Sequence, residues 1–208
     1  MWPWISLVVL GAYHGVNPAM GWLFAVAKGL QERRRSAVLA ALLPIAAGHA
    51  VAIGLAVAGF SALCGMAAPA LLRWLVVASL ILFGTVKLLK PRLHPAWVGM
   101  RVGAFELAFW SFLMATAHGA GLMLLPVLMA MPDSRLSIDV NHHTHLISMA
   151  LDARVVLVHT AAMFLTMTGV AVAVYEKIGL AMLGRAWVNL DVIWAATILV
   201  AGVATLLT

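Results

Sequence analysis

The sequence predicts an all-α integral membrane protein with six transmembrane helices, arranged as two three-helix repeats of opposite orientation. Three observations support this fold class: the composition, six long apolar segments, and a histidine motif that occurs in both halves. Of the 208 residues, 64% are hydrophobic and 10% are charged, and the mean hydropathy is +1.06. Soluble domains have roughly 45–50% apolar and 25% charged residues. We therefore expect a multi-pass protein of the cell (inner) membrane, with the lipid bilayer as its main partner.

Six segments are long and apolar enough to cross about 30 Å of hydrocarbon. They cover residues 4–27, 36–60, 67–89, 104–131, 151–175 and 186–207. The connections after the first, third and fifth segments hold ten of the thirteen Lys and Arg residues. The positive-inside rule makes these connections cytoplasmic, which places both termini on the extracytoplasmic side. The formal charge of +6 is explained by this topology, so we expect no nucleic-acid partner.

The first segment contains a polar stretch from Gly11 to Met20, with His14 and Pro18 at its centre. A proline inside a membrane helix frees a carbonyl group, so this stretch is costly unless it serves a function. A similar stretch in the fourth segment contains His118 and is followed by Pro126. This recurrence indicates two related halves.

The second and fifth segments extend the pattern, because His49 and His159 are each followed by small residues. Each half has three crossings, an odd number, so the second half must enter the membrane from the opposite side. We expect one repeat at 1–90, a cytoplasmic linker at 91–103 and a second repeat at 104–208. Transporters with such inverted repeats bind their substrate between the repeats, near the midplane.

All four histidines lie deep in their segments, with His14, His49 and His118 near the centre and His159 about a turn and a half away from it. Ionisable residues at this depth are expensive and usually face a bundle interior or a water-filled path. A single one is equally well explained as a hydrogen bond between helices. Four in a repeated pattern favour one site, and imidazole is a ligand of nickel, cobalt, copper, zinc and iron.

The stretch His14-Gly15-Val16-Asn17-Pro18-Ala19-Met20 resembles the His-x-x-Asp-Pro-Asp-His signature of nickel/cobalt transporters in the lysine-exporter-like superfamily. Gly48-His49-Ala50 resembles the Gly-His-small motif of their next core helix, and Lys28-Gly29 matches a Lys-Gly of their efflux branch. The resemblance implies a transporter whose substrate is a transition-metal ion. It assigns His14, Asn17 and His49 as ligands, with Met20 in a ligand position.

This chain differs from that signature at the two carboxylates and the second histidine, where it has Asn17, Ala19 and Met20. The change removes two negative charges and introduces a soft thioether. A divalent ion has less charge compensation in such a site, whereas His and Met suit a softer ion such as Cu(I).

A segment between the fourth and fifth spans contains His142, His143 and His145, within an expected extracytoplasmic loop at 132–150. Short His-rich tracts occur in metal-binding segments, so one interpretation is transient metal capture. The other is an ordinary polar loop. Capture outside the cell favours uptake, whereas Lys28-Gly29 is typical of efflux, so both transport directions stay open.

Charged residues near the spans give two further expectations. Asp191, about two turns into the sixth span, needs a proton, a cation or Arg73 as partner, and one interpretation gives it a coupling role. Asp152 and Arg154 are expected to cap the fifth helix or pair with each other.

Three glycines of the second span, Gly48, Gly54 and Gly59, are expected to allow close helix packing.

Three classes of function remain open. The first is a metal transporter with His14, His49, His118 and His159 around a midplane site. The second is an electron-transfer membrane subunit in which these histidines ligate haem b. The third is an organic-solute or oxyanion exporter, or a non-transporting subunit. The sequence has no phosphate loop, nucleophile triad or paired-carboxylate motif, so we expect no enzyme, and an accessory membrane subunit or a homo-oligomer is compatible with all three classes.

Overall fold

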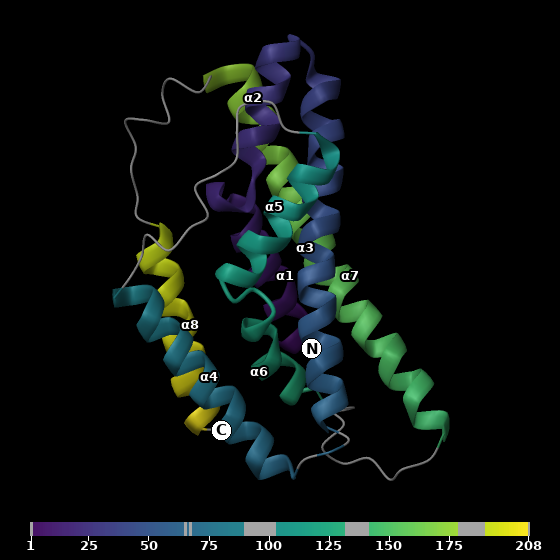
Figure 1. The fold of residues 1–208 in the computed structure, drawn as a ribbon, viewed down its shortest axis with the longest axis vertical. Coiled ribbons are helices and arrows are strands. Elements are labelled where there is room, and N and C mark those ends of the chain that lie inside the picture. The colour runs from purple at the N-terminus through teal and green to yellow at the C-terminus, as the bar shows by residue number, and fades with distance from the viewer. Residues whose placement is uncertain are drawn as a thin grey trace.

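The computed structural model describes residues 2–64, 66, 68–89, 103–131, 142–178 and 190–207, and within them it is helical and has no strand (Figure 1). The α-helices are α1 (Trp2–Val16), α2 (Trp22–Glu32), α3 (Arg35–Cys64), α4 (Pro69–Leu89), α5 (Ala104–Ala117), α6 (Leu125–Met129), α7 (His142–Ala173) and α8 (Leu190–Leu207). Two 3-10 turns, η1 (Pro18–Met20) and η2 (Leu122–Leu124), and one π-helix, η4 (Val174–Ile178), complete the described elements.

Several helices are suited to a bilayer. Within the described residues, α3, most of α4 and residues 149–177 are each long and apolar enough to cross a membrane. The segments α5 and η2–α6 meet at a bend of 54° and together make a fourth candidate span. The chain is therefore a helical membrane protein. The first expected span is divided at η1 into α1 and α2, and in the sixth the described apolar helix covers residues 195–206.

The helices pack in three main pairs: α1 with α7, α3 with α5, and α4 with α8. The two inner pairs are joined where α3 contacts α7, and α2 packs beside α3. The start of α1 and the end of α8 both lie toward the end of the molecule opposite the turn between α2 and α3 (Figure 1). That turn carries the basic run Arg33–Arg35, and Arg35 forms an ion pair of 3.1 Å with Glu176 of η4.

Glycines bring the inner helices into backbone contact. A Cβ atom at Gly11 of α1 would collide with the carbonyl oxygen of His159, and one at Gly15 would lie 2.5 Å from the carbonyl oxygen of Met163. Since Gly11 and Gly15 are four residues apart, they form a small-xxx-small face of the kind that lets membrane helices approach closely. Gly48 does the same for α3, where a Cβ would overlap the backbone of α5.

The expectation for the other two glycines of α3 was wrong. Cβ atoms at Gly54 and Gly59 would meet nothing within 4 Å. Gly48 is therefore the one of the three that allows close packing.

The outer pair, α4 and α8, packs through a reciprocal glycine contact. Gly84 of α4 faces Ile198 and Leu199 of α8, while Gly202 of α8 faces Leu80 and Ile81 of α4. Each helix thus offers a glycine to the residues that lie three or four positions before the glycine of the other. Arg73 closes this pair at one end, because it donates hydrogen bonds to the carbonyl groups of Thr205 and Leu206.

The buried apolar residues form two clusters that follow each other along the bundle. On α3, Ile45 belongs to one cluster and Ile53 to the other; on α7, Met163 belongs to the first and Val155 to the second. His49 and His159 lie between these pairs in the sequence. The histidines therefore occupy a polar layer between two hydrophobic layers.

Two expected segments lie largely outside the described residues, namely the linker 91–103 before Gly103 and the part of the loop 132–150 that precedes His142. The backbone of residues 142–150 is helical and continuous with α7, where a loop was expected.

We predict that Gly48→Ala destabilises the protein more than Gly54→Ala. The added methyl group at position 48 overlaps the Ala108 backbone, and overpacking of this kind typically costs about 1–3 kcal/mol. At position 54 the methyl group has open space, and Ala favours a helix over Gly by up to about 1 kcal/mol. Thermal unfolding of both purified variants in one detergent, followed by intrinsic fluorescence, would measure the difference. Equal melting temperatures would contradict the close contact between α3 and α5.

Candidate metal centre

The position of His14 follows from the break in the first helix. The helix α1 ends at Val16, Asn17 adopts an extended conformation, and Gly21 has a positive φ of 110° that few residues other than glycine adopt. The Asn17 side-chain oxygen accepts a hydrogen bond of 3.0 Å from the Ala19 N–H. The indole of Trp22 donates to the Val16 carbonyl at 3.1 Å. These bonds stabilise the break with His14 in the last turn of α1.

The fourth expected span breaks in a related way. The helix α5 ends at Ala117, His118 caps it, and Gly119 has a positive φ of 67°. The Nδ1 atom of His118 lies 2.9 Å from the carbonyl oxygen of Met114, four residues earlier. His14 makes the equivalent bond of 2.8 Å to the carbonyl oxygen of Leu10. In both histidines Nδ1 is therefore the donor, and in a neutral ring Nε2 carries the lone pair.

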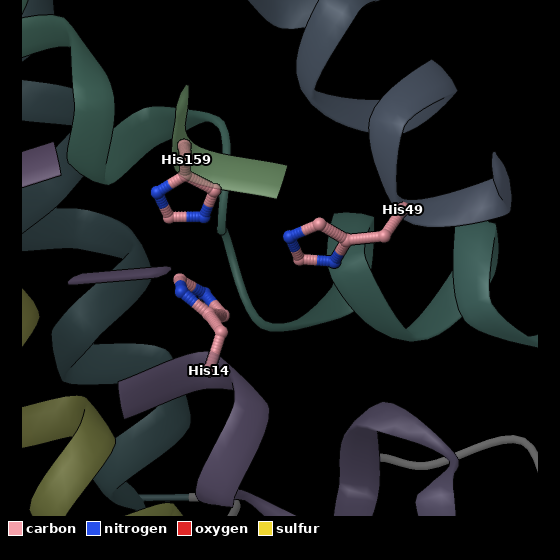
Figure 2. Close-up of side chains that lie close together, drawn as sticks. All are labelled: His14, His49 and His159. Atoms are coloured by element: carbon pink, nitrogen blue, oxygen red, sulfur yellow. The ribbon is translucent and has the colours of Figure 1, made fainter. Parts of the chain in front are cut away.

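Three of the four histidines meet in the interior, as Figure 2 shows. His14 from α1, His49 from α3 and His159 from α7 point toward one another, and each is no more than 1% exposed. The ring centroids of His14 lie 5.2 Å from His49 and 5.0 Å from His159. His49 and His159 are stacked, with centroids 5.7 Å apart and ring planes 9° from parallel. The arrangement joins both halves of the chain.

One ring nitrogen from each histidine lies within 4.8 Å of a ring nitrogen of the other two. Three nitrogens bound to one metal ion at 2.0–2.1 Å are separated by about 3.3–3.6 Å. Side-chain rotations that move each ring nitrogen by about an ångström would bring the three nitrogens to that separation. The donor set, buried and contributed by three helices, fits a transition-metal ion.

The hydrogen bonding of these rings also fits a ligand role. Neither ring nitrogen of His49 meets a hydrogen-bond partner within the described part of the chain. The backbone of Leu7 approaches the His159 ring without completing a hydrogen bond of normal geometry. Burying a polar group without a partner costs about 1–3 kcal/mol in proteins. A bound ion would take up the lone pair of one nitrogen in each ring.

The cluster carries no negative charge. Among the described residues, no Asp or Glu belongs to the set formed by His14, His49 and His159. Three neutral imidazoles leave the full charge of a bound ion in a low-dielectric interior, which penalises a divalent ion more than a monovalent one.

The remaining residues of the nickel/cobalt-like motif have other positions. The side-chain oxygen of Asn17 caps the start of η1, which gives this residue a structural role. Met20 is 1% exposed and lies on η1, within the break. His118 is also buried and lies close enough to His14 to interact with it electrostatically, but it is outside the set of three. The carbonyl groups of His14, Asn17 and Pro18 accept backbone hydrogen bonds within the break.

Other charged and histidine residues singled out in the sequence lie elsewhere. The side chains of His142, His143, His145 and Asp191 are outside the described part of the structure. The bonds of Arg73 to Thr205 and Leu206 place it near the end of α8, whereas Asp191 lies fourteen residues before Thr205, about 21 Å along the helix.

Asp152 is bonded to a residue that the sequence did not indicate. The hydroxyl of Ser61 on α3 lies 2.8 Å from a carboxylate oxygen of Asp152 on α7. The two residues are 91 positions apart, so only the packing of α3 against α7 brings them together. Trp22 was missed as well, although its position just after Gly21 agrees with a role in stabilising the break.

Comparison of the chain with protein-family models, with curated protein sequences and with solved structures returned no match. The class of protein is therefore defined by its own residues, as a helical membrane protein with a buried three-histidine cluster.

We predict that Trp22→Phe destabilises the protein more than Trp110→Phe. The Trp22 indole satisfies the partly buried Val16 carbonyl, and leaving a carbonyl unpaired away from water costs up to about 1–3 kcal/mol. The Trp110 indole nitrogen is buried without a hydrogen-bond partner among the described residues, so its loss removes no bond. Chemical denaturation of both variants in detergent would compare them. A larger loss for Trp110→Phe would contradict this account of the break.

Proposed function

We propose that the protein is a membrane transporter of a transition-metal ion, with His14, His49 and His159 as its substrate site. One observation carries the proposal: three buried histidines from three helices place ring nitrogens within 4.8 Å of one another. Such a group is expensive in a membrane interior, and ionisable residues there usually serve transport, binding or proton transfer. The cluster lies between two hydrophobic layers, as a midplane site would.

The helix contacts support an inverted repeat of three plus three spans. If α1, α3 and α4 correspond to α5, α7 and α8, the pair α1–α7 corresponds to α5–α3, and α4 pairs with its own counterpart α8. A two-fold axis in the membrane plane would relate these contacts. The reciprocal contact of Gly84 and Gly202 and the matching Nδ1 bonds of His14 and His118 agree with such an axis. Binding between repeats is the arrangement expected of transporters with this symmetry.

The charge of the site favours monovalent copper over the nickel or cobalt suggested by the sequence motif. Imidazole binds copper well, and a monovalent ion needs less charge compensation than a divalent one. Since no described carboxylate joins the cluster, Cu(I) is the substrate we propose.

The two alternatives receive less support. A haem b held by two histidines needs their imidazoles on opposite faces of the macrocycle, whereas here the His14 ring packs edge-on against both His49 and His159. An oxyanion would need N–H donors and a positive charge to balance its own. Among the described buried residues, no Lys or Arg side chain lies near the cluster. Lys87 is buried, but it lies in the last turn of α4.

We predict that the wild-type protein binds one Cu(I) per chain and that His14→Ala and His49→Ala each weaken this binding at least about 100-fold. Loss of an outer-shell partner alone typically costs 10–100-fold, so loss of a ligand should cost more. Metal content after equilibration and competition with a colorimetric Cu(I) chelator would measure it, and the visible spectrum would reveal haem.

His118→Ala is the matched control for these variants. His118 is equally buried and makes the same type of Nδ1 bond as His14, yet it lies outside the set of three. We expect its copper affinity to stay within about three-fold of the wild type and copper transport into proteoliposomes to follow the same order. Absence of metal in the wild type, after equilibration with copper, nickel, cobalt and zinc, would contradict the proposed function.

A further inference from the structure

A groove of about 450 Å³ runs between α3 and α7 on one side of the histidine cluster. Residues between Ala50 and Ala58 form its α3 wall, and residues between Asp152 and Thr160 form its α7 wall. Its inner end, at Ala50 and Thr160, is formed by the residues that directly follow His49 and His159. One end of the groove therefore lies one residue along each helix from the two stacked imidazoles, which are buried outside its lining.

Small residues keep this groove open. A Cβ atom at Gly54 would meet nothing within 4 Å, and Ala50, Ala58 and Ala153 also face the space. The same helices are in close contact with other neighbours through Gly48 and Gly11. The groove thus occupies the stretch of the α3–α7 contact between residues 50–58 and 152–160.

Asp152 is the one acidic residue of the groove lining. It lies seven residues before His159, which places both on the same face of α7 and about 10.5 Å apart along the axis. The Ser61 hydroxyl lies 2.8 Å from its carboxylate.

The position of this carboxylate is unusual among the acidic side chains that the structure describes. Glu32 and Glu176 pair with arginines near the turn between α2 and α3, and Glu106 lies exposed in the first turn of α5. Asp152 lies instead beside Leu151 and Val155, which pack in the hydrophobic cluster that also contains Leu7 of α1 and Ile198 of α8.

A second polar group lines the groove beside the cluster. The Thr160 hydroxyl lines the groove next to His159, and its oxygen is buried without a hydrogen-bond partner among the described residues. A cation that leaves water must exchange its hydration shell for protein oxygens or nitrogens in small steps. Asp152 supplies such a step about 10.5 Å along α7 from His159, and Thr160 supplies one beside the imidazoles.

We propose that the groove between α3 and α7 is the route by which a metal cation reaches the histidine cluster from the end of the molecule that carries the chain ends, and that Asp152 is its first, weak binding site. This inference rests on the proposed function. The carboxylate attracts the cation and lowers its free energy in the apolar groove, while the cluster holds it more tightly. Because the route serves both directions, its loss slows arrival and departure alike and leaves the equilibrium affinity unchanged.

Asp152→Asn tests this role, because it removes the charge and keeps the size and the contact with Ser61. We expect association and dissociation of Cu(I) to slow by roughly ten-fold each, a typical size for the loss of local electrostatic focusing. The dissociation constant should stay within two-fold of the wild type. Stopped-flow mixing with a chromophoric Cu(I) chelator would measure both rates.

Glu106→Gln is the matched control, since it removes the same charge from a carboxylate outside the groove. Its rates should equal those of the wild type. Unchanged rates in Asp152→Asn, or a weaker affinity with unchanged association, would overturn the proposed route. A wild type that binds no metal would overturn the proposed function, and the charge selectivity of the groove is then measured without metal as follows.

A second experiment examines the groove without any metal. In a Cys64→Ala background, Ala153→Cys places a thiol beside Asp152 in the lining. A cationic methanethiosulfonate reagent should modify this thiol several-fold faster than an anionic one, and adding Asp152→Asn should remove the difference. Equal rates for the two reagents with Asp152 present would overturn the proposal. Charge selectivity in a protein that binds no copper would instead show that the proposed function alone is wrong.

Discussion

Backbone contact between helices is the constraint on which this structure depends. In a bilayer, lipid tails are as apolar as side chains, so helices associate through close packing and hydrogen bonds. Gly11 and Gly15 allow α1 to lie directly on α7, and Gly48 allows α3 to lie directly on α5. These contacts fix the rotation of each helix about its axis. That rotation decides which side chains face one another, and the convergence of His14, His49 and His159 follows from it.

The histidine layer is positioned by the two apolar clusters on either side of it. Ile45 and Met163 pack in one cluster, and Ile53 and Val155 pack in the other. Such layers exclude water from the cluster and keep the local dielectric low. The selectivity of the cluster for an ion then depends on its neutral donors and on the charge of the ion. The bond from Nδ1 of His14 to Leu10 adds a fixed orientation, because it leaves Nε2 as the lone-pair nitrogen.

The candidate residues of this site could be predicted from the sequence, but which of them meet could not. Pro18 and the buried histidines are visible in the sequence because each violates what hydrocarbon tolerates. The three histidines that meet are decided by the packing of α1 on α7. This packing requires glycines of α1 to fit against a backbone about 150 residues away in the sequence. The same limit explains Gly54, which faces open space although it resembles Gly48 in sequence. It also explains the contact of Ser61 with Asp152, which no local pattern encodes.

The reciprocal contact between α4 and α8 has a consequence for the origin of the chain. Gly84 fits against the residues just before Gly202, and Gly202 fits against the residues just before Gly84. The two helices therefore present the same surface pattern to each other. Interfaces of this kind are isologous, the form that two identical subunits make around a two-fold axis. A chain divided between α4 and α5 would yield two pieces that already carry matching surfaces. Under the proposed inverted repeat, gene duplication and fusion of a dimer of oppositely oriented three-helix subunits would produce the chain without a new interface.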